Sequence, residues 1–271
     1  MVVLSELKHT SAPRHELGTC AWARREMTTI KNAALALMRW LLSKFNLLLL
    51  TQVDLDSTIS ARTEQLRQAF TSLEKSYDIT LESLGNVLDL KEGATKGHSK
   101  RVTAFAIAIA RAMGLSMDQI RVIARGAFLH DIGKMAIPDA ILRKPGRLDP
   151  DEIAIMREHP FRGFQMVQRI PFLAEAAEII YCHHERYDGT GYPRGLRGKQ
   201  IPLGARILAV ANTLDSLTSK LPYRTALTVS AAREEIKRGL GRQFDPHVVE
   251  TFFKMPEHIW GDLRKGIEEQ L

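Results

Sequence analysis

Apolar residues recur at helical spacing along most of the chain after residue 93, and this periodicity most restricts the possible folds. One stripe runs through Val102, Phe105 and Ile109 at steps of three and four. Such steps place side chains on one face of an α-helix, where they can pack against a core. The period-two alternation of half-buried strands is nearly absent. We therefore predict an all-α fold, with an irregular loop over residues 188–202.

Capping residues mark several helix boundaries. Ser116 is expected to cap the helix that follows it. Asp149, Pro150 and Glu152 have the order of an N-cap, a first-turn proline and a capping-box acid. Further helices are predicted over residues 173–181, 205–217 and 230–238.

Two segments precede this helical region. Residues 1–55 are basic and partly apolar, and their fold cannot be assigned. Residues 56–92 carry apolar side chains at steps of three, four or seven, which predicts a long amphipathic helix for signalling or dimerisation. Two arrangements stay open: a helix packed on the core, or a parallel coiled coil that joins two protomers through residues 59–90. Residues 93–271 form the predicted functional domain.

The chain carries 38 Lys and Arg residues against 31 Asp and Glu, a formal net charge of +7. It lacks zinc-finger spacing and an aromatic-rich basic groove, so nucleic acid is not expected as a partner. Residues 33–50 are strongly apolar, but Arg39, Lys44 and Asn46 interrupt them. Because charges are costly inside hydrocarbon, contact with a membrane surface or a partner helix is favoured over a spanning helix.

Cysteine usage and the first residues indicate the compartment. Cys20 and Cys182 are isolated thiols, which suits a reducing environment better than a disulfide scaffold. The start, MVVLSELKHT, does not resemble a secretory signal, because acidic residues and His precede any apolar core. We expect a cytoplasmic protein, with peripheral membrane association through residues 33–50 left open.

Histidines near helix ends are the strongest chemical signal. Each is weak alone, because a single His or a His-Asp pair is usually an ordinary surface or capping feature. Five of the nine histidines nevertheless lie at or near ends of predicted helices, with Asp131 beside them: His98, His130, His159, His183 and His184. Helical bundles can direct such side chains into one pocket, where imidazole and carboxylate bind Fe, Mn, Zn or Ni. The set exceeds the need of one ion, and two ions about 3.5–4 Å apart can ionise water and neutralise a phosphodiester.

Around these residues the chain resembles the HD-GYP subgroup of the HD-superfamily phosphohydrolases. The similarity covers about residues 88–253 and includes GHSKRV at 97–102, LHDIGKMAIPDAIL at 129–142 and HHERYDGTGYPRGLRG at 183–198. The resemblance implies an HD-superfamily helical bundle. It also implies a phosphodiesterase that uses two divalent metal ions, Fe or Mn, to hydrolyse cyclic di-GMP to linear pGpG, GMP or both.

The resemblance further implies roles for single positions. The implied metal ligands are His98, His130, Asp131, His159, His183 and His184, together with Asn212 at the position of a family ligand. Asp131 would bridge two ions, and Lys134 would meet a substrate phosphate, so these two are the implied catalytic residues. The implied substrate-binding residues are Lys134, Gly191, Tyr192, Pro193 and Arg224. Tyr192, in the GYP loop, would stack on or hydrogen-bond a guanine.

Three positions depart from the family pattern. Asn212 stands where the family has a ligand Asp and offers only a neutral carbonyl oxygen, so one ion would bind more weakly. Leu221 replaces an Arg that contacts the nucleotide. Ala94 lacks the carboxylate of three-metal members, which limits this site to two ions.

These departures leave an alternative function open. The chain would then be a catalytically weakened module that binds cyclic di-GMP, or that docks a GGDEF-type or other signalling partner through the GYP loop. A hydrolase for another phosphorylated substrate is a third interpretation.

Overall fold

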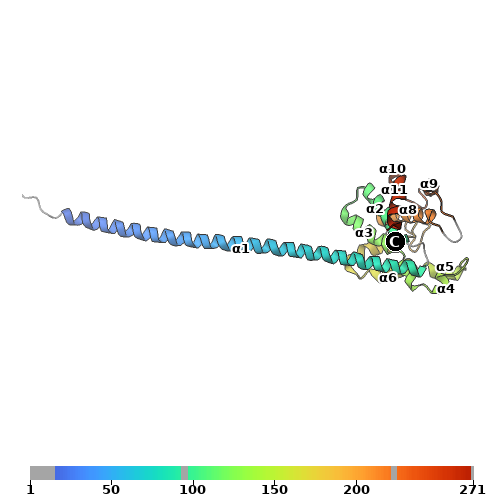
Figure 1. Cartoon of the computed structure of the whole chain (residues 1–271), viewed down its shortest axis with the longest axis horizontal. Helices are drawn as coiled ribbons and strands as arrows, with labels where there is room; N and C mark the ends of the chain where they lie inside the picture. The colour runs from blue at the N-terminus through green and yellow to red at the C-terminus, as the bar shows by residue number, and fades with distance from the viewer. Residues whose placement is uncertain (1–15, 93–96, 221–224, 270–271) are drawn as a thin grey trace, which may run out of the picture. The chain divides into compact units, whose positions relative to one another are not determined.

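The computed structural model describes residues 16–92, 97–220 and 225–269. Within these ranges the regular elements are α-helices and short 3-10 helices, with one isolated bridge between Leu240 and Phe244 (Figure 1). The predicted all-α fold is therefore confirmed. The chain divides into two units, Met1–Leu73 and Glu74–Leu271.

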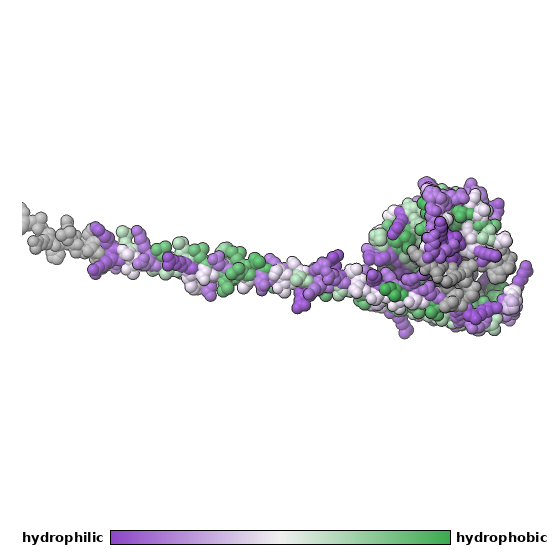
Figure 2. Space-filling model, viewed as in Figure 1, coloured by the Kyte–Doolittle hydropathy of each residue, from purple (hydrophilic) through white to green (hydrophobic). Residues whose placement is uncertain are grey.

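Helix α1, Glu16–Glu92, spans the boundary between the two units. Every described side chain from residue 24 to residue 73 is exposed. The helix contains an 18-residue window of mean hydropathy 1.5, none of it buried, and could cross a membrane by length and composition alone. Figure 2 shows apolar residues gathered along this unit, and Trp40, Leu41 and Phe45 are among the exposed ones. Membrane contact and coiled-coil pairing of this helix stay predictions.

The second unit holds the remaining helices. They are α2 (His98–Ala112), α3 (Met117–Phe128), η1 (Ile132–Ala136), α4 (Asp139–Leu142), α5 (Pro150–Met156), α6 (His159–Val167), η2 (Pro171–Leu173), α7 (Ala174–Cys182), η3 (Gly198–Gln200), α8 (Leu203–Thr218), α9 (Val229–Arg238), α10 (Pro246–Lys254) and α11 (His258–Glu268). The helices predicted from periodicity correspond to α2, α7, α8 and α9. The predicted irregular loop contains only the short turn η3.

Two capping boxes form as predicted. The Ser116 hydroxyl accepts from the backbone N–H of Gln119 at 3.3 Å, and the Gln119 side chain accepts from the Ser116 N–H at 3.0 Å. Asp149 and Glu152 exchange the same pair of bonds at the start of α5, each at 2.9 Å. These bonds satisfy N–H groups that a helix start would otherwise leave without partners.

The larger hydrophobic core lies between α2 and α8, with α10 and α11 also packed on α2. Phe105 of α2 meets Trp260 of α11 edge to face, with ring centroids 5.7 Å apart. A second, smaller cluster includes Leu129 and Ile132, which flank the His-Asp pair in the chain. Buried apolar neighbours therefore hold this part of the backbone in place.

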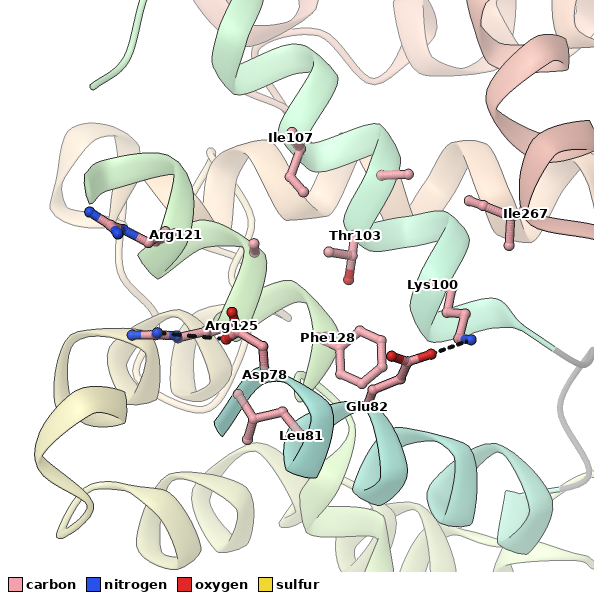
Figure 3. Close-up of a pocket in the computed structure, with 12 residues that line it drawn as sticks. Asp78, Leu81, Glu82, Lys100, Thr103, Ile107, Arg121, Arg125, Phe128 and Ile267 are labelled. Carbon is pink, nitrogen blue, oxygen red and sulfur yellow. Dashed lines mark ion pairs between the residues drawn. The ribbon is translucent and has the colours of Figure 1, made fainter. Parts of the chain in front are cut away.

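The last turns of α1 pack on α2 and α3 within the second unit. Leu81 is buried, and a Cβ added to Gly85 would lie 2.3 Å from Cε1 of Phe128. Glu82 pairs with Lys100 of α2 at 2.6 Å, beside a cavity of about 410 Å³ (Figure 3). One face of the predicted amphipathic helix thus contributes to the core.

The end of α1 also reaches η1. The Lys91 ammonium donates to the backbone carbonyls of Met135 at 2.7 Å and Ile137 at 3.4 Å. A cation at carbonyls that lack helical partners stabilises the end of such a turn. On the other face of α1, Leu84 and Val87 stay exposed.

Candidate metal centre

Helix ends bring the predicted metal ligands together. His98 and His159 are the first residues of α2 and α6, and His183 directly follows α7. His130 and Asp131 lie between α3 and η1. The ligands therefore come from separate segments and meet around one carboxylate.

Asp131 is the carboxylate at the centre of this arrangement. Its Oδ1 is 3.3 Å from Nε2 of His159 and 3.7 Å from Nε2 of His183. Its Oδ2 is 3.1 Å from Nε2 of His130. Two groups of ligand atoms share this residue, each within 4.8 Å: Asp131 with His159, His183 and His184, and Asp131 with His98 and His130. A carboxylate shared in this way can bridge two cations.

Backbone carbonyls set the tautomers of three histidines. In each, Nδ1 lies near the carbonyl oxygen three residues earlier: His130 to Ala127 at 2.7 Å, His159 to Met156 at 2.8 Å and His183 to Ile180 at 2.7 Å. A carbonyl can only accept, so Nδ1 donates and Nε2 keeps its lone pair. Each Nε2 is then the atom offered to a metal.

The same tautomers make lone pairs face one another. Nε2 of His130 is buried with no hydrogen-bond partner in the described part of the chain, although Oδ2 of Asp131 is 3.1 Å away. Nε2 of His159 and Nε2 of His183 are 3.2 Å apart. Acceptor-to-acceptor contacts in a buried site are unfavourable unless a cation lies between them. The residues present therefore fit a metal.

Burial and neighbouring charges together control the protonation of the proposed ligands. It holds the pKa of His183 well below its usual value, with neighbouring histidines adding to the effect, and it lowers the pKa of His184 to about 3. Burial alone would raise the pKa of Asp131, but His130 and Lys134 outweigh it and keep that pKa well below its usual value. Burial also opposes charge on His130, yet Asp131 prevails and raises the pKa of His130. A metal therefore competes with a proton at His130, which weakens binding in acid.

Asp215 orients His98 through a hydrogen bond to the ring nitrogen that does not face the metal centre. Its Oδ2 accepts from Nδ1 of His98 at 2.8 Å, and its Oδ1 accepts from Arg101 at 2.7 Å and from Arg264 at 2.8 Å. Burial alone would raise the pKa of Asp215, but hydrogen bonds from His98 and Arg101 hold it at about 2. The ionised carboxylate accepts a hydrogen bond from Nδ1–H of His98 and leaves Nε2 for a metal.

A cavity of about 360 Å³ opens beside the histidines. His183, His184, Gly191, Tyr192 and Asn212 are among its lining residues. The Tyr192 ring stacks on His184, with centroids 4.7 Å apart and planes 17° apart. Burial raises the pKa of Tyr192 to about 12, so its hydroxyl stays protonated and can donate a hydrogen bond.

The other predicted site residues have different placements. Lys134 lies beside Asp131, with Nζ 2.7 Å from Oδ2. Pro193 is exposed, next to Tyr192. Arg224, Leu221 and Ala94 lie outside the described residues.

Glu185 is a functional candidate that the sequence prediction missed. It is buried, and its two carboxylate oxygens accept from the backbone N–H groups of Arg194 at 2.7 Å and Leu196 at 3.0 Å. Gly191 passes so close that an added Cβ would lie 2.6 Å from the Glu185 Cα. The carboxylate therefore holds both ends of the GYP loop together. The only available signal was an acid directly after His184.

Replacing Glu185 with Ala is expected to lower the free energy of unfolding by roughly 1.5–3 kcal/mol, because a charged hydrogen-bond acceptor is lost. Glu185→Gln should lose less, since its amide oxygen can still accept one of the two bonds. Urea denaturation measures both. Glu234→Ala, at an exposed position on α9, is the matched control. Equal destabilisation by the two Ala variants would contradict a role for Glu185 in holding the loop.

Known proteins share this sequence pattern. A model of the HD domain family matches residues 82–248. The cyclic di-GMP phosphodiesterase response regulator RpfG of Xanthomonas campestris pv. campestris is 39% identical over 193 residues, covering 70% of this chain and 51% of the relative. The 3′3′-cGAMP-specific phosphodiesterase 2 of Vibrio cholerae is 39% identical over 186 residues, covering 68% of this chain and 35% of the relative. The chain spans about half, or less, of the length of these relatives.

A solved structure shares the fold. A cyclic GMP-AMP-specific phosphodiesterase of Vibrio cholerae superposes with a TM-score of 0.54 at 21% identity, over 70% of this chain and 52% of the other. The family match itself extends over more than half of the chain and contains every histidine of the metal centre. The chain therefore belongs to the HD domain family, as its HD-GYP motifs predicted.

Proposed function

We propose that this chain is a metal-dependent phosphodiesterase that hydrolyses cyclic di-GMP to linear pGpG, GMP or both. The observation that carries the proposal is Asp131, whose carboxylate is shared by two groups of histidine nitrogens. The names of the two relatives support cyclic dinucleotides as the substrate class.

Two divalent cations, Fe or Mn, are the proposed cofactors. Each group of ligand atoms around Asp131 would hold one ion. Imidazole nitrogen and carboxylate oxygen suit both metals. When bound, such a pair supplies an ionised water and neutralises the charge of a phosphodiester.

The chain's own residues would bind and orient the diester. Lys134, now beside Asp131, would turn to a non-bridging phosphate oxygen, where negative charge grows during attack. The protonated hydroxyl of Tyr192 would donate to a guanine, and Gly191 and Pro193 would shape the loop around it. Arg224 would add a phosphate contact. Solvent would protonate the 3′ oxygen that leaves.

A catalytically weakened binding module is the second candidate function, and Asn212 favours it. This residue lines the cavity with His183 and His184. Its amide offers one neutral oxygen, whereas a carboxylate there would attract a cation more strongly.

Hydrolysis assays on the native chain and on Asn212→Asp separate these functions. We expect the native chain to hydrolyse cyclic di-GMP, and Asn212→Asp to raise metal affinity roughly 10-fold or more. Asn86→Asp makes the same chemical change at an exposed position on α1 and should alter neither property. Elemental analysis gives metal content, and chromatography gives the ratio of pGpG to GMP.

The outcomes of this experiment are distinct. Binding without turnover in the native chain, with turnover appearing in Asn212→Asp, would establish the binding module. Faster hydrolysis of 3′3′-cGAMP than of cyclic di-GMP would change the proposed substrate.

We also propose that the chain forms a homodimer through residues 59–90, which include exposed apolar side chains such as Leu66, Phe70 and Leu84. Light scattering would contradict this if the full chain stayed monomeric at micromolar concentration.

Docking of a GGDEF-type or other signalling partner through the GYP loop would be weakened by Tyr192→Ala. Sedimentation with anionic vesicles would test peripheral membrane contact by residues 33–50 of a cytoplasmic protein.

A further inference from the structure

We infer that Arg157 is a further substrate-binding residue, which contacts the cyclic dinucleotide phosphate that is not at the metal centre. The inference rests on the proposed function. Arg157 is the C-cap residue of α5 and lines the same cavity as His183 and His184. Its guanidinium carbon is 5.2 Å from the ring centroid of Tyr192.

A cyclic dinucleotide needs a second cationic group in this cavity besides the metal centre. It carries two phosphodiester groups, and only one can meet the metal centre at a time. Among the described residues that line the cavity, the cations are Arg157 and Arg186. Arg186 is already engaged, because its Nε donates to Thr190 at 3.1 Å and lies 3.8 Å from Asp188. Among the described lining residues, Arg157 is therefore the cation available to a second phosphate.

Neighbouring acids are bonded to other groups. Glu158, next to Arg157 in the chain, pairs with Arg162 at 2.6 Å. Glu185, the acid of the cavity lining, accepts two backbone N–H groups of its own loop. No carboxylate in the described ranges forms an ion pair with Arg157, which is exposed. A guanidinium in this state is suited to a bidentate contact with phosphate.

Tyr192 keeps this guanidinium at the cavity. His184 stacks nearly parallel on the Tyr192 ring, and the Arg157 guanidinium carbon also lies over this ring. A cation–π contact orients the side chain without neutralising its charge. It also changes the expected role of Tyr192: because His184 and Arg157 both contact the ring, a hydrogen bond from the hydroxyl to a guanine is favoured over stacking.

We expect Arg157→Ala to raise the KM for cyclic di-GMP roughly 10- to 100-fold, because a charge-assisted contact made in the bound state is lost. The kcat and the metal content should stay close to native values. Arg157→Lys should recover part of the loss, since it keeps the charge but not the fork. Arg169→Ala, an exposed arginine outside the cavity lining, is the matched control.

A small substrate tests the metal centre without involving Arg157. Bis(p-nitrophenyl) phosphate has a single diester and no second phosphate. Its hydrolysis should therefore be the same in the native chain and in Arg157→Ala. An equal loss on both substrates would overturn the inference, because it would place the defect at the metal centre.

If Arg157 acted only by positioning Tyr192, the double variant would show a different effect on KM. In a Tyr192→Leu background, Arg157→Ala would then cause no further change in KM, whereas loss of a direct phosphate contact would still raise KM.

An unchanged KM for cyclic di-GMP in Arg157→Ala overturns the inference and leaves the phosphodiesterase proposal intact. If the native chain does not hydrolyse cyclic di-GMP, that proposal fails separately, and calorimetric titration with the nucleotide decides the inference. Equal affinities of native chain and variant overturn it, and a loss of roughly tenfold or more supports it.

Discussion

Replacing Asp131 with Asn is expected to remove bound metal and to lower phosphodiesterase turnover on the order of 10³-fold or more. The native carboxylate stays ionised and faces histidine nitrogens with both oxygens. Asn keeps the shape but offers one neutral oxygen, and its NH₂ group would face a nitrogen lone pair or the Lys134 ammonium. Neither group of ligands would then hold its ion.

Elemental analysis and turnover of cyclic di-GMP are the measurements for this variant. Asp262→Asn, an exposed position on α11, is the control for the chemical change alone. Urea denaturation separates loss of metal from loss of fold. Full metal content and native turnover in Asp131→Asn would refute the shared-carboxylate site.

Gly133→Ala is expected to destabilise the second unit by about 3 kcal/mol and to displace His159, a proposed metal ligand. A Cβ at this position would lie 1.8 Å from the carbonyl oxygen of His159 and 2.5 Å from the backbone nitrogen of Gly163. Both obstacles are backbone atoms of α6, so they cannot rotate away as a side chain could. The helix must move, and it carries His159 with it.

The matched control is Gly261→Ala on α11, where an added Cβ would meet nothing within 4 Å. It should be neutral or stabilising by up to about 1 kcal/mol, because Ala favours a helix more than Gly does. Denaturation curves and metal affinity are measured for both variants. Equal stability of the two would show that η1 and α6 are not in close contact.

Much of the second unit could be predicted from local patterns. The stripe from Val102 to Ile109 lies within α2, and the boxes at Ser116 and Asp149 cap their helices. These patterns work because their partners lie within one or two turns of the chain. The first 55 residues had no assignable fold, and the structure describes residues 16–55 as part of α1. All described side chains of that stretch from residue 24 onward are exposed, so no buried face imposes a clear period on it.

Contacts between distant residues escaped the sequence prediction. Asp215 meets Arg101 across 114 positions and Arg264 across 49. Glu185 holds a loop that returns to it after nine and eleven residues. Periodicity carries no information about such pairs, since they form only where separate helices and loops dock.

The sequence alone predicted a metal site, because five histidines and Asp131 lie near helix ends that local patterns locate. The position of Asp131 between two groups of ligands, the close approach of Gly133 to α6 and the seat of Arg157 over Tyr192 came from packing. A shift of about 1 Å between these elements would misalign the site without altering any helical repeat. For that reason the residue types indicate the kind of chemistry, while the packing of the helices determines which atoms can carry it out.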